Sequence, residues 1–414
     1  MSDSSTPDMS DLSEAERPKE PGELRSGERV FQKPVIHGDE SAESRSASWL
    51  ELFFDLFFVA AIARIAHHLA GHYSVEGLLT FLVVFAALWW VWMSDTYYSI
   101  RFETKGALQR IYVLALMFPV LAMAILGTAA LTDQMIGFAV AFAVARIING
   151  VMWARAAYYL PRTRPYIRWV LWTLVVALSV LSLVLVVPPG YVLAVLAAAV
   201  AISIAGMGFA APAQRHLPSL PRDKLPERHG LFIIIILGET IVPLAVPPDE
   251  MGGLATAMTI GSGILIAIGF WWTYFDFIAR RPPRKEVRWF TLWGYLHLPL
   301  AVALTLNGVG VAMIIDGQYA FAPEFLLWAS GLSLIAIGSL EWPVEHGRLQ
   351  PYPFPESLLM KLALGAVLIG LAVFADPSEP LALSAVLSAL FVCVVYSVWR
   401  FAVATPEQLE NFEA

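Results

Sequence analysis

Residues 76–98 read EGLLTFLVVFAALWWVWMSDTYY, and no charged residue lies between Glu76 and Asp95. The hydrocarbon core of a bilayer is about 30 Å thick, and a helix that rises about 1.5 Å per residue crosses it in about 20 residues. In hydrocarbon, the backbone N–H and C=O groups must bond within the segment itself, as they do in an α-helix. This stretch therefore predicts a membrane-spanning helix.

Runs of this kind recur, and they predict an all-α, polytopic transmembrane helix bundle of about 12 helices. Their approximate ranges are 49–70, 76–98, 109–131, 134–158, 167–187, 190–211, 229–247, 254–279, 288–314, 323–342, 357–375 and 381–403. The composition agrees, because 58% of the residues are hydrophobic and 15% are charged, whereas soluble domains carry about 25% charged residues. A water-soluble domain is therefore excluded.

The chain outside these runs is polar. Residues 1–48 hold 11 acidic and 6 basic residues and few large apolar ones, which is typical of a disordered segment. No apolar segment precedes Trp49, so the first spanning helix is expected to act as an uncleaved insertion signal. The predicted organisation is a disordered acidic cytoplasmic tail over 1–48, a first six-helix repeat over 49–211, a cytoplasmic connecting loop over 212–228, a second six-helix repeat over 229–403 and a cytoplasmic tail over 404–414.

The basic residues of the loops fall on one side of the predicted helices. That side holds Arg101, Lys105, Arg110, Arg162, Arg164, Arg168, Arg215, Arg222, Lys224, Arg228, Arg280, Arg281, Arg284, Lys285, Arg288 and Arg348. The loops on the other side contain acidic residues such as Asp133, Asp249 and Asp376 but no Lys or Arg. Because Lys and Arg are enriched in cytoplasmic loops, both termini are expected in the cytoplasm.

The two halves of the predicted bundle resemble two copies of one unit. The matching pairs, each separated by a similar number of positions, are Trp90 and Trp272, Asp95 and Asp276, Pro119 and Pro299, and Asp55 and Glu239. Six helices return the chain to its starting side, so the copies would be parallel, as the two halves of many transporters are. We therefore predict an internal repeat, with chance likeness between apolar helices as the alternative.

Two stretches carry a family resemblance. Residues 51–59 read ELFFDLFFV, and a second stretch runs from Glu227-Arg228-His229-Gly230 to Leu237-Gly238-Glu239. Both resemble the bacterial low temperature requirement A (LtrA) family, and the resemblance covers residues 49–403. It implies a multi-pass protein of the bacterial cytoplasmic (inner) membrane and supplies little mechanism.

A second resemblance bears on mechanism. Residues Phe53-Phe54-Asp55 are similar to the Phe-Ser-Asp signature of a family of lysosomal and bacterial potassium channels that are built from six-helix units. Phe54 stands in place of the serine here, and this departure puts conduction by that mechanism in doubt. The likeness is an analogy of fold.

Ionisable residues within spanning helices are costly, and they usually are paired or face a wet interior. Arg146, Glu239 and His297 are the deepest, and they lead the candidate site for an ion, a proton or a substrate. Two interpretations stay open for Arg146 and Glu239. One is a structural ion pair, and the other is a proton- or ion-handling pair beside Pro243, which weakens the helix at Glu239.

The candidate site also includes residues on the first helix. Glu51 and Asp55 are four positions apart and share one face, where two carboxylates favour a cation between them. The alternative for Glu51 is an acid stabilised by a helix N-terminus. Asn149 and Asn307 complete the site as neutral partners.

A candidate cytoplasmic gate consists of Asp95, Arg101, Asp276 and Arg280. Each acid lies near the predicted inner end of its helix, shortly before an arginine. Such a cluster of acids and bases would lock the cytoplasmic face, whereas the simpler interpretation is an interfacial carboxylate beside loop arginines.

Twelve helices, a repeat and charges at membrane depth favour a secondary transporter or permease, with proton coupling as one option. The alternatives are a cation channel of a two-times-six-helix type and, less favoured, a lipid-modifying membrane enzyme. No enzyme activity, cofactor or metal is expected, and no phosphate-binding loop is present. The net charge of −7 argues against a nucleic-acid partner. The expected partners are the lipid bilayer and an unknown small solute or ion, and the oligomeric state stays open.

Overall fold

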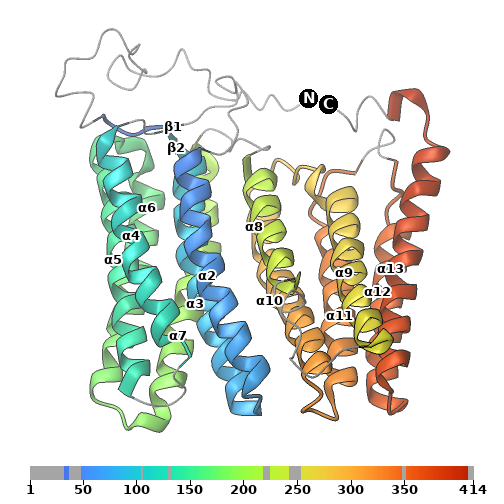
Figure 1. The fold of residues 1–414 in the computed structure, drawn as a ribbon. Helices are drawn as coiled ribbons and strands as arrows, with labels where there is room; N and C mark the ends of the chain where they lie inside the picture. The colour runs from blue at the N-terminus through green and yellow to red at the C-terminus, as the bar shows by residue number, and fades with distance from the viewer. Residues whose placement is uncertain are drawn as a thin grey trace. The chain divides into compact units, whose positions relative to one another are not determined.

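The computed structural model describes residues 32–36, 48–103, 106–128, 133–217, 224–241, 253–346 and 351–408. These ranges contain twelve α-helices (Figure 1). Their bounds are α2 Trp49–Gly71, α3 Val75–Arg101, α4 Ala107–Leu126, α5 Asp133–Tyr159, α6 Arg164–Leu181, α7 Val192–Ala210, α8 Lys224–Ile241, α9 Leu254–Tyr274, α10 Val287–Asp316, α11 Ala322–Leu340, α12 Glu356–Phe374 and α13 Glu379–Ala402. The all-α, polytopic fold is confirmed.

Ten helical segments within the described ranges are long and apolar enough to cross a membrane. They correspond to α3–α7 and α9–α13, so α2 and α8 are not among them. Short 3₁₀ turns border several of the ten: Pro161–Thr163, Ser182–Leu185, Pro189–Tyr191 and Ala211–His216. A π-helical turn, Phe275–Ala279, continues α9.

Several helix ends follow from local chemistry. Proline stands in the first turn of α6, α11 and α13, where a missing N–H is not needed. Gly317 ends α10 in a left-handed conformation with φ of 67°, which favours glycine. One predicted boundary shifts, because α8 begins at Lys224 and so takes up the last part of the connecting loop predicted over 212–228.

The chain divides into two compact units. Unit 1 is Met1–Arg64 with Leu79–Leu225, and unit 2 is Ile65–Leu78 with Pro226–Ala414. The turn between α2 and α3 thus belongs to unit 2, where the backbone N–H of Tyr73 donates to the Tyr319 hydroxyl at 3.1 Å. The unit boundary falls within the predicted connecting loop, and the prediction that the units are copies of each other stays a prediction.

In unit 1, α5 packs against α4, α6 and α7. Two short strands, β1 (Val35–Ile36) and β2 (Phe102–Glu103), pair in antiparallel orientation directly after α3. Arg155 of α5 also donates to the carbonyl of Gln32. The prediction of disorder over all of 1–48 is therefore wrong for residues 32–36, because contacts with distant helix ends hold them.

In unit 2, α11 packs against α10, α12 and α13, and α9 packs against α13. The closest approach of α11 to α12 involves two glycines. A Cβ atom placed on Gly331 would lie 2.7 Å from the carbonyl oxygen of Gly365, and one on Gly365 would lie 2.6 Å from that of Gly331. The two backbones touch, as small residues allow in membrane helices.

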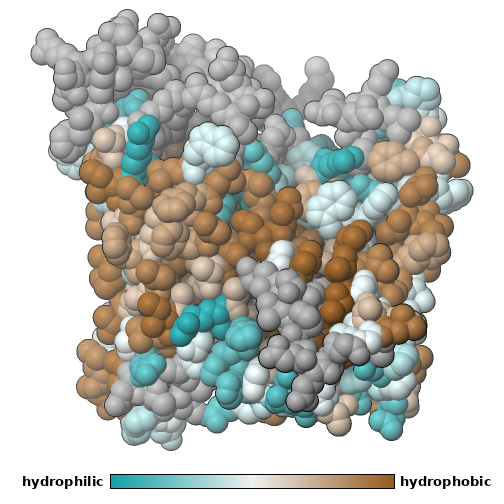
Figure 2. All heavy atoms as spheres, viewed as in Figure 1, coloured by the Kyte–Doolittle hydropathy of each residue, from teal (hydrophilic) through white to brown (hydrophobic). Residues whose placement is uncertain are grey.

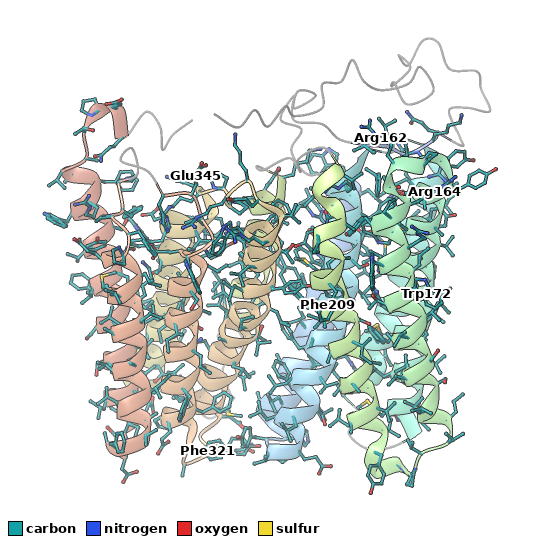
Figure 3. All side chains as sticks on the ribbon, turned by 180° about the vertical axis from the view of Figure 1, so that it is seen from behind. Arg162, Arg164, Trp172, Phe209, Phe321 and Glu345 are labelled. Carbon is teal, nitrogen blue, oxygen red and sulfur yellow. The ribbon has the colours of Figure 1, made fainter. Side chains whose placement is uncertain are left out.

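Large apolar side chains lie on the outside of the helices. Phe118, Phe209 and Phe374 are 76%, 75% and 89% exposed. Figure 2 shows hydrophobic residues along the sides of the helices on the visible face. Figure 3 shows Arg162 and Arg164 at one end of the helices of unit 1 and Trp172 farther along. Together with the ten apolar segments, this surface identifies an integral membrane protein.

Replacing Gly365 by alanine should destabilise the fold. The new methyl group would meet the backbone of Gly331 and the Ile335 side chain, at 2.6 and 2.7 Å, and forced repacking of this kind costs about 1–3 kcal/mol. We expect a lower thermal unfolding midpoint for purified Gly365→Ala. The control is Gly370→Ala on the same helix, where a Cβ meets nothing within 4 Å. Equal midpoints for the two variants would contradict the close contact.

Candidate functional site

The predicted site residues of unit 1 include Asp55, which is fully buried on α2. Its carboxylate accepts a hydrogen bond from Nε1 of Trp92, on α3, at 2.8 Å. The acid of the ELFFDLFFV stretch therefore points into the protein and not into lipid.

Arg146 is the central residue of α5 and is 6% exposed. Its guanidinium lies over the ring of Trp90, 5.7 Å from the ring centroid. Within the described residues, its Nε and Nη1 atoms have no hydrogen-bond partner. One helical turn further on, Asn149 is 2% exposed and donates from Nδ2 to the carbonyl of Val91 at 3.3 Å.

The predicted pairing of Arg146 with Glu239 stays a prediction. The side chain of Glu239 lies outside the described residues, although its backbone belongs to α8. Pro243 lies outside them as well. Among the described carboxylates, none forms an ion pair with Arg146.

Glu51 forms a helix cap. Its carboxylate accepts from the backbone N–H of Ser48 at 2.8 Å, and its own N–H donates to the Ser48 hydroxyl at 3.3 Å. This reciprocal pair is a capping box, which satisfies two backbone donors at the start of α2. The contacts fit the helix N-terminus interpretation of Glu51.

The residues of the candidate gate lie in different surroundings. Asp95 and Arg101 are buried in unit 1, and Nη2 of Arg101 donates to Oε1 of Gln214 at 2.8 Å. In unit 2, Asp276 lies on the π-helical turn and accepts from the Ser397 hydroxyl of α13, whereas Arg280 is exposed. A gate formed by these four residues stays a prediction.

His297 belongs to a cluster of buried rings in unit 2. Its Nδ1 lies 2.8 Å from the carbonyl of Trp293, and its Nε2 lies 3.0 Å from the Tyr274 hydroxyl. A carbonyl only accepts, so Nδ1 carries the proton and the neutral ring accepts at Nε2. The ring of His229, from α8, lies 4.4 Å from the His297 ring.

Asn307 joins α10 to α11. Its amide nitrogen donates to the carbonyl of Ala303 at 2.8 Å and to the Ser333 hydroxyl at 2.9 Å, while its oxygen accepts from Ser330. These contacts use both amide hydrogens and the oxygen. The geometry thus gives Asn307 a bracing role between two helices.

A buried ion network lies at one end of unit 2. Oε1 of Glu341, after α11, accepts from Lys361 Nζ at 2.7 Å and from the Ser357 hydroxyl at 2.9 Å. Oε2 of Glu341 accepts from Arg281 Nη1 at 3.3 Å. The side chains of Glu341 and Lys361 are 0% exposed and that of Arg281 is 1% exposed. One carboxylate thus lies between two cations.

Aromatic rings and further cations surround this network. Lys361 Nζ lies 3.4 Å from the centroid of the Phe277 ring, a cation–π contact in a dry site. Burial and the nearby charges of Arg281 and Arg284 lower the pKa of half-buried His346 to about 4. His346 is therefore neutral near pH 7 and adds no third positive charge there.

The predicted site and gate include neither Glu341 nor Lys361. Lys361 stands alone in the apolar run 357–375, and a lone lysine at that depth was the available signal. Its contact with Ser357, four positions earlier, also fits helical spacing. The ring cluster around His297 could be recognised only from the structure, because Tyr274, His229 and Trp293 come from three helices.

Removing Glu341 should be more damaging than removing Lys361. Glu341→Gln strands two buried cations, a kind of change that costs about 3–5 kcal/mol, whereas Lys361→Met leaves Arg281 and Glu341 paired. We expect the double variant to lose less than the sum of the two single losses. Unfolding free energies of the four proteins, measured in detergent, give this coupling. Strictly additive losses would contradict the network.

The sequence was compared with known proteins. It matches the family described as "Bacterial low temperature requirement A protein (LtrA)" over residues 46–401. It is also similar to an uncharacterised protein of Rhizobium meliloti (strain 1021), with 26% identity over 379 residues, which cover 81% of this chain and 90% of that protein. The ELFFDLFFV stretch, whose acid bonds Trp92, and the helix that carries His229 both lie within the matched range. This chain therefore belongs to the LtrA family of bacterial membrane proteins.

Proposed function

We propose that this protein is a secondary transporter of the bacterial inner membrane that moves a small solute or ion and is coupled to protons. The observation that carries the proposal is the burial of charged side chains inside both units. Asp55 and Arg146 are buried in unit 1, and Glu341 and Lys361 in unit 2. Charges at membrane depth are costly, and they commonly mark the pathways of ions, protons and substrates.

The pattern of helix packing supports an internal repeat. In unit 1, α5 contacts α4, α6 and α7, and α6 contacts α7. In unit 2, α11 contacts α10, α12 and α13, and α12 contacts α13. Counting six helices from each member of the first set reaches the corresponding member of the second. Parallel repeats with the same packing pattern are a common plan of secondary transporters.

The coupling residue in this proposal is Glu239, near the sequence position of Pro243. A carboxylate in an apolar helix gains and loses a proton more readily than an arginine does. His297 is a weaker candidate for this role, because its neutral ring already has partners at both nitrogens.

A cation channel is the second candidate function. The observation in its favour is the buried Asp55 on the first helix of a six-helix unit, within the Phe53-Phe54-Asp55 stretch. The hydrogen bond from Trp92 at 2.8 Å already occupies one oxygen of this carboxylate. A channel dissipates a gradient and cannot concentrate a solute, so one experiment separates the two functions.

Proteoliposomes that contain the purified protein should accumulate a solute when a pH gradient is imposed. A panel of labelled small solutes, tested with and without the gradient, measures this. We expect Glu239→Gln to stay folded and to lose the pH dependence of uptake, while Glu345→Gln, a change at an exposed loop carboxylate, keeps it. Uptake by Glu239→Gln with unaltered pH dependence would contradict the coupling. Equilibration without accumulation would favour the channel.

Both termini should face the cytoplasm. The residues of segment 32–36 lie beside the end of α5 that leads to Arg162 and Arg164, which supports placing the N-terminal side with the basic loops. Topology reporters fused after Asp133, Asp249 and Asp376 should then read as external. Cytoplasmic readings at two of these three positions would overturn this orientation.

A further inference from the structure

Arg146 lies at mid-depth of unit 1. As the central residue of α5, Asp133–Tyr159, it is roughly 20 Å from either helix end at about 1.5 Å per residue. It is 6% exposed, so its side chain turns away from lipid. A guanidinium at this depth cannot reach the headgroup region, and its partner must come from the protein or from a bound molecule.

Among the described residues, the printed contact of this guanidinium is a ring face, and no acceptor pairs with its Nε or Nη1. Trp90 lies 5.7 Å away and attracts the cation through its π-system. A ring face leaves the N–H groups in the guanidinium plane unfilled, and Nε and Nη1 have no partner among the described residues. The carboxylate of Asp55, which is also buried in unit 1, accepts from Trp92. Within the described part of the chain, Nε and Nη1 of Arg146 are thus left for an acceptor on a bound molecule.

Asn149 adds a buried acceptor on the same face of α5. Positions three apart are neighbours on a helix, so its amide lies one turn from Arg146. Its Nδ2 donates to the Val91 carbonyl at 3.3 Å, which fixes the amide nitrogen toward that carbonyl. The remaining Oδ1 is buried and has no hydrogen-bond partner in the described part of the chain. This oxygen can accept from an N–H or O–H group.

The ring beside Arg146 belongs to a pair of tryptophans on α3. The ring of Trp89 is fully buried and lies 6.0 Å from the Trp90 ring. Its Nε1 is a further buried donor that lacks a partner within the described residues. Indole rings supply apolar contact area together with a single donor. The cluster thus offers donors for an anion, one acceptor, and apolar walls.

We propose that Arg146 and Asn149 bind a small organic carboxylate that also carries a hydroxyl or amino group. The guanidinium pairs with the carboxylate through its planar donors, a geometry that matches two oxygens. The Asn149 oxygen accepts from the hydroxyl or amino group, and the indoles of Trp89 and Trp90 contact the carbon skeleton. The proposal that a carboxylate binds here is argued from the side-chain geometry. The proposal that this carboxylate is the transported substrate rests also on the proposed transport function.

The binding test uses the purified full-length chain in detergent. Thermal unfolding is followed with acetate, glycolate, lactate, mandelate, glycine or phenylalanine, each at the ionic strength of a sodium chloride reference. We expect carboxylates with a hydroxyl or amino group to raise the unfolding midpoint most. Equal shifts with chloride, or no shift with any carboxylate, would overturn the proposal.

Variants separate a binding role of Arg146 from a structural one. Without ligand, Arg146→Met should unfold at a higher temperature than the parent, because it removes a buried cation that lacks an acceptor. It should also bind the carboxylate at least about tenfold more weakly. Arg64→Gln, at an exposed arginine of α2, is the matched control and should keep the affinity. A lower midpoint for Arg146→Met with unchanged affinity would show a structural role and overturn the site.

Asn149→Ala tests the second contact. It should weaken the binding of glycolate or glycine and leave that of acetate nearly unchanged, because acetate has no donor for the amide oxygen. Equal weakening for all three ligands would remove Asn149 from the site. Uptake of the best-binding carboxylate by proteoliposomes then tests transport separately. Binding without uptake would contradict the transport proposal and keep the site, whereas uptake of another solute without carboxylate binding would do the reverse.

Discussion

A charge buried among apolar helices must find its partner inside the protein, because lipid tails offer none. In unit 2, Glu341 meets this need for Lys361 and Arg281 together, at 2.7 and 3.3 Å. The carboxylate follows α11, the lysine belongs to α12, and the arginine follows the π-helical turn after α9. One acid thus joins three segments, and the backbone contact between Gly331 and Gly365 holds two of them close together. The charges of Glu341, Lys361 and Arg281 at this end of unit 2 are therefore paired with one another.

Unit 1 meets the same constraint differently. Arg146 is as deeply enclosed, yet its neighbour is the ring of Trp90 and no described carboxylate is within ion-pair distance. The buried acid Asp55 of the same unit accepts from Trp92. A buried cation without an acceptor is costly, so Arg146 requires an acceptor beyond the contacts of the described residues. The described residues of the two units therefore treat a buried cation differently: Lys361 and Arg281 share a carboxylate, whereas Arg146 lies over an indole ring.

Features set within one segment of the chain, such as the helices, could be predicted from the sequence. Features that arise from contacts between distant segments could not. Apolar runs predict helices because the backbone bonding they need is local, and the depth of Arg146 and Asp55 follows from counting residues. The helix N-terminus role of Glu51 was one of its two predicted interpretations, and Ser48 three positions before it is the capping signal that favours it. The ion network of Lys361, Glu341 and Arg281 could not be predicted from the sequence, because these residues come from three separate segments. The same holds for β1 and β2, each of two residues.

The hydrogen bonds within the ring cluster argue against His297 as a proton carrier. His297 donates from Nδ1 to a carbonyl and accepts at Nε2 from Tyr274, so its neutral form has both nitrogens bonded. A second proton would make Nε2 a donor, and the Tyr274 hydroxyl would have to turn its hydrogen toward a dry surrounding. The adjacent His229 ring belongs to the Glu227-Arg228-His229-Gly230 stretch, and its contact with Trp293 at 5.1 Å joins α8 to α10. His297 therefore packs between helices in its neutral form, and the proposed proton coupling calls for a carboxylate as the carrier.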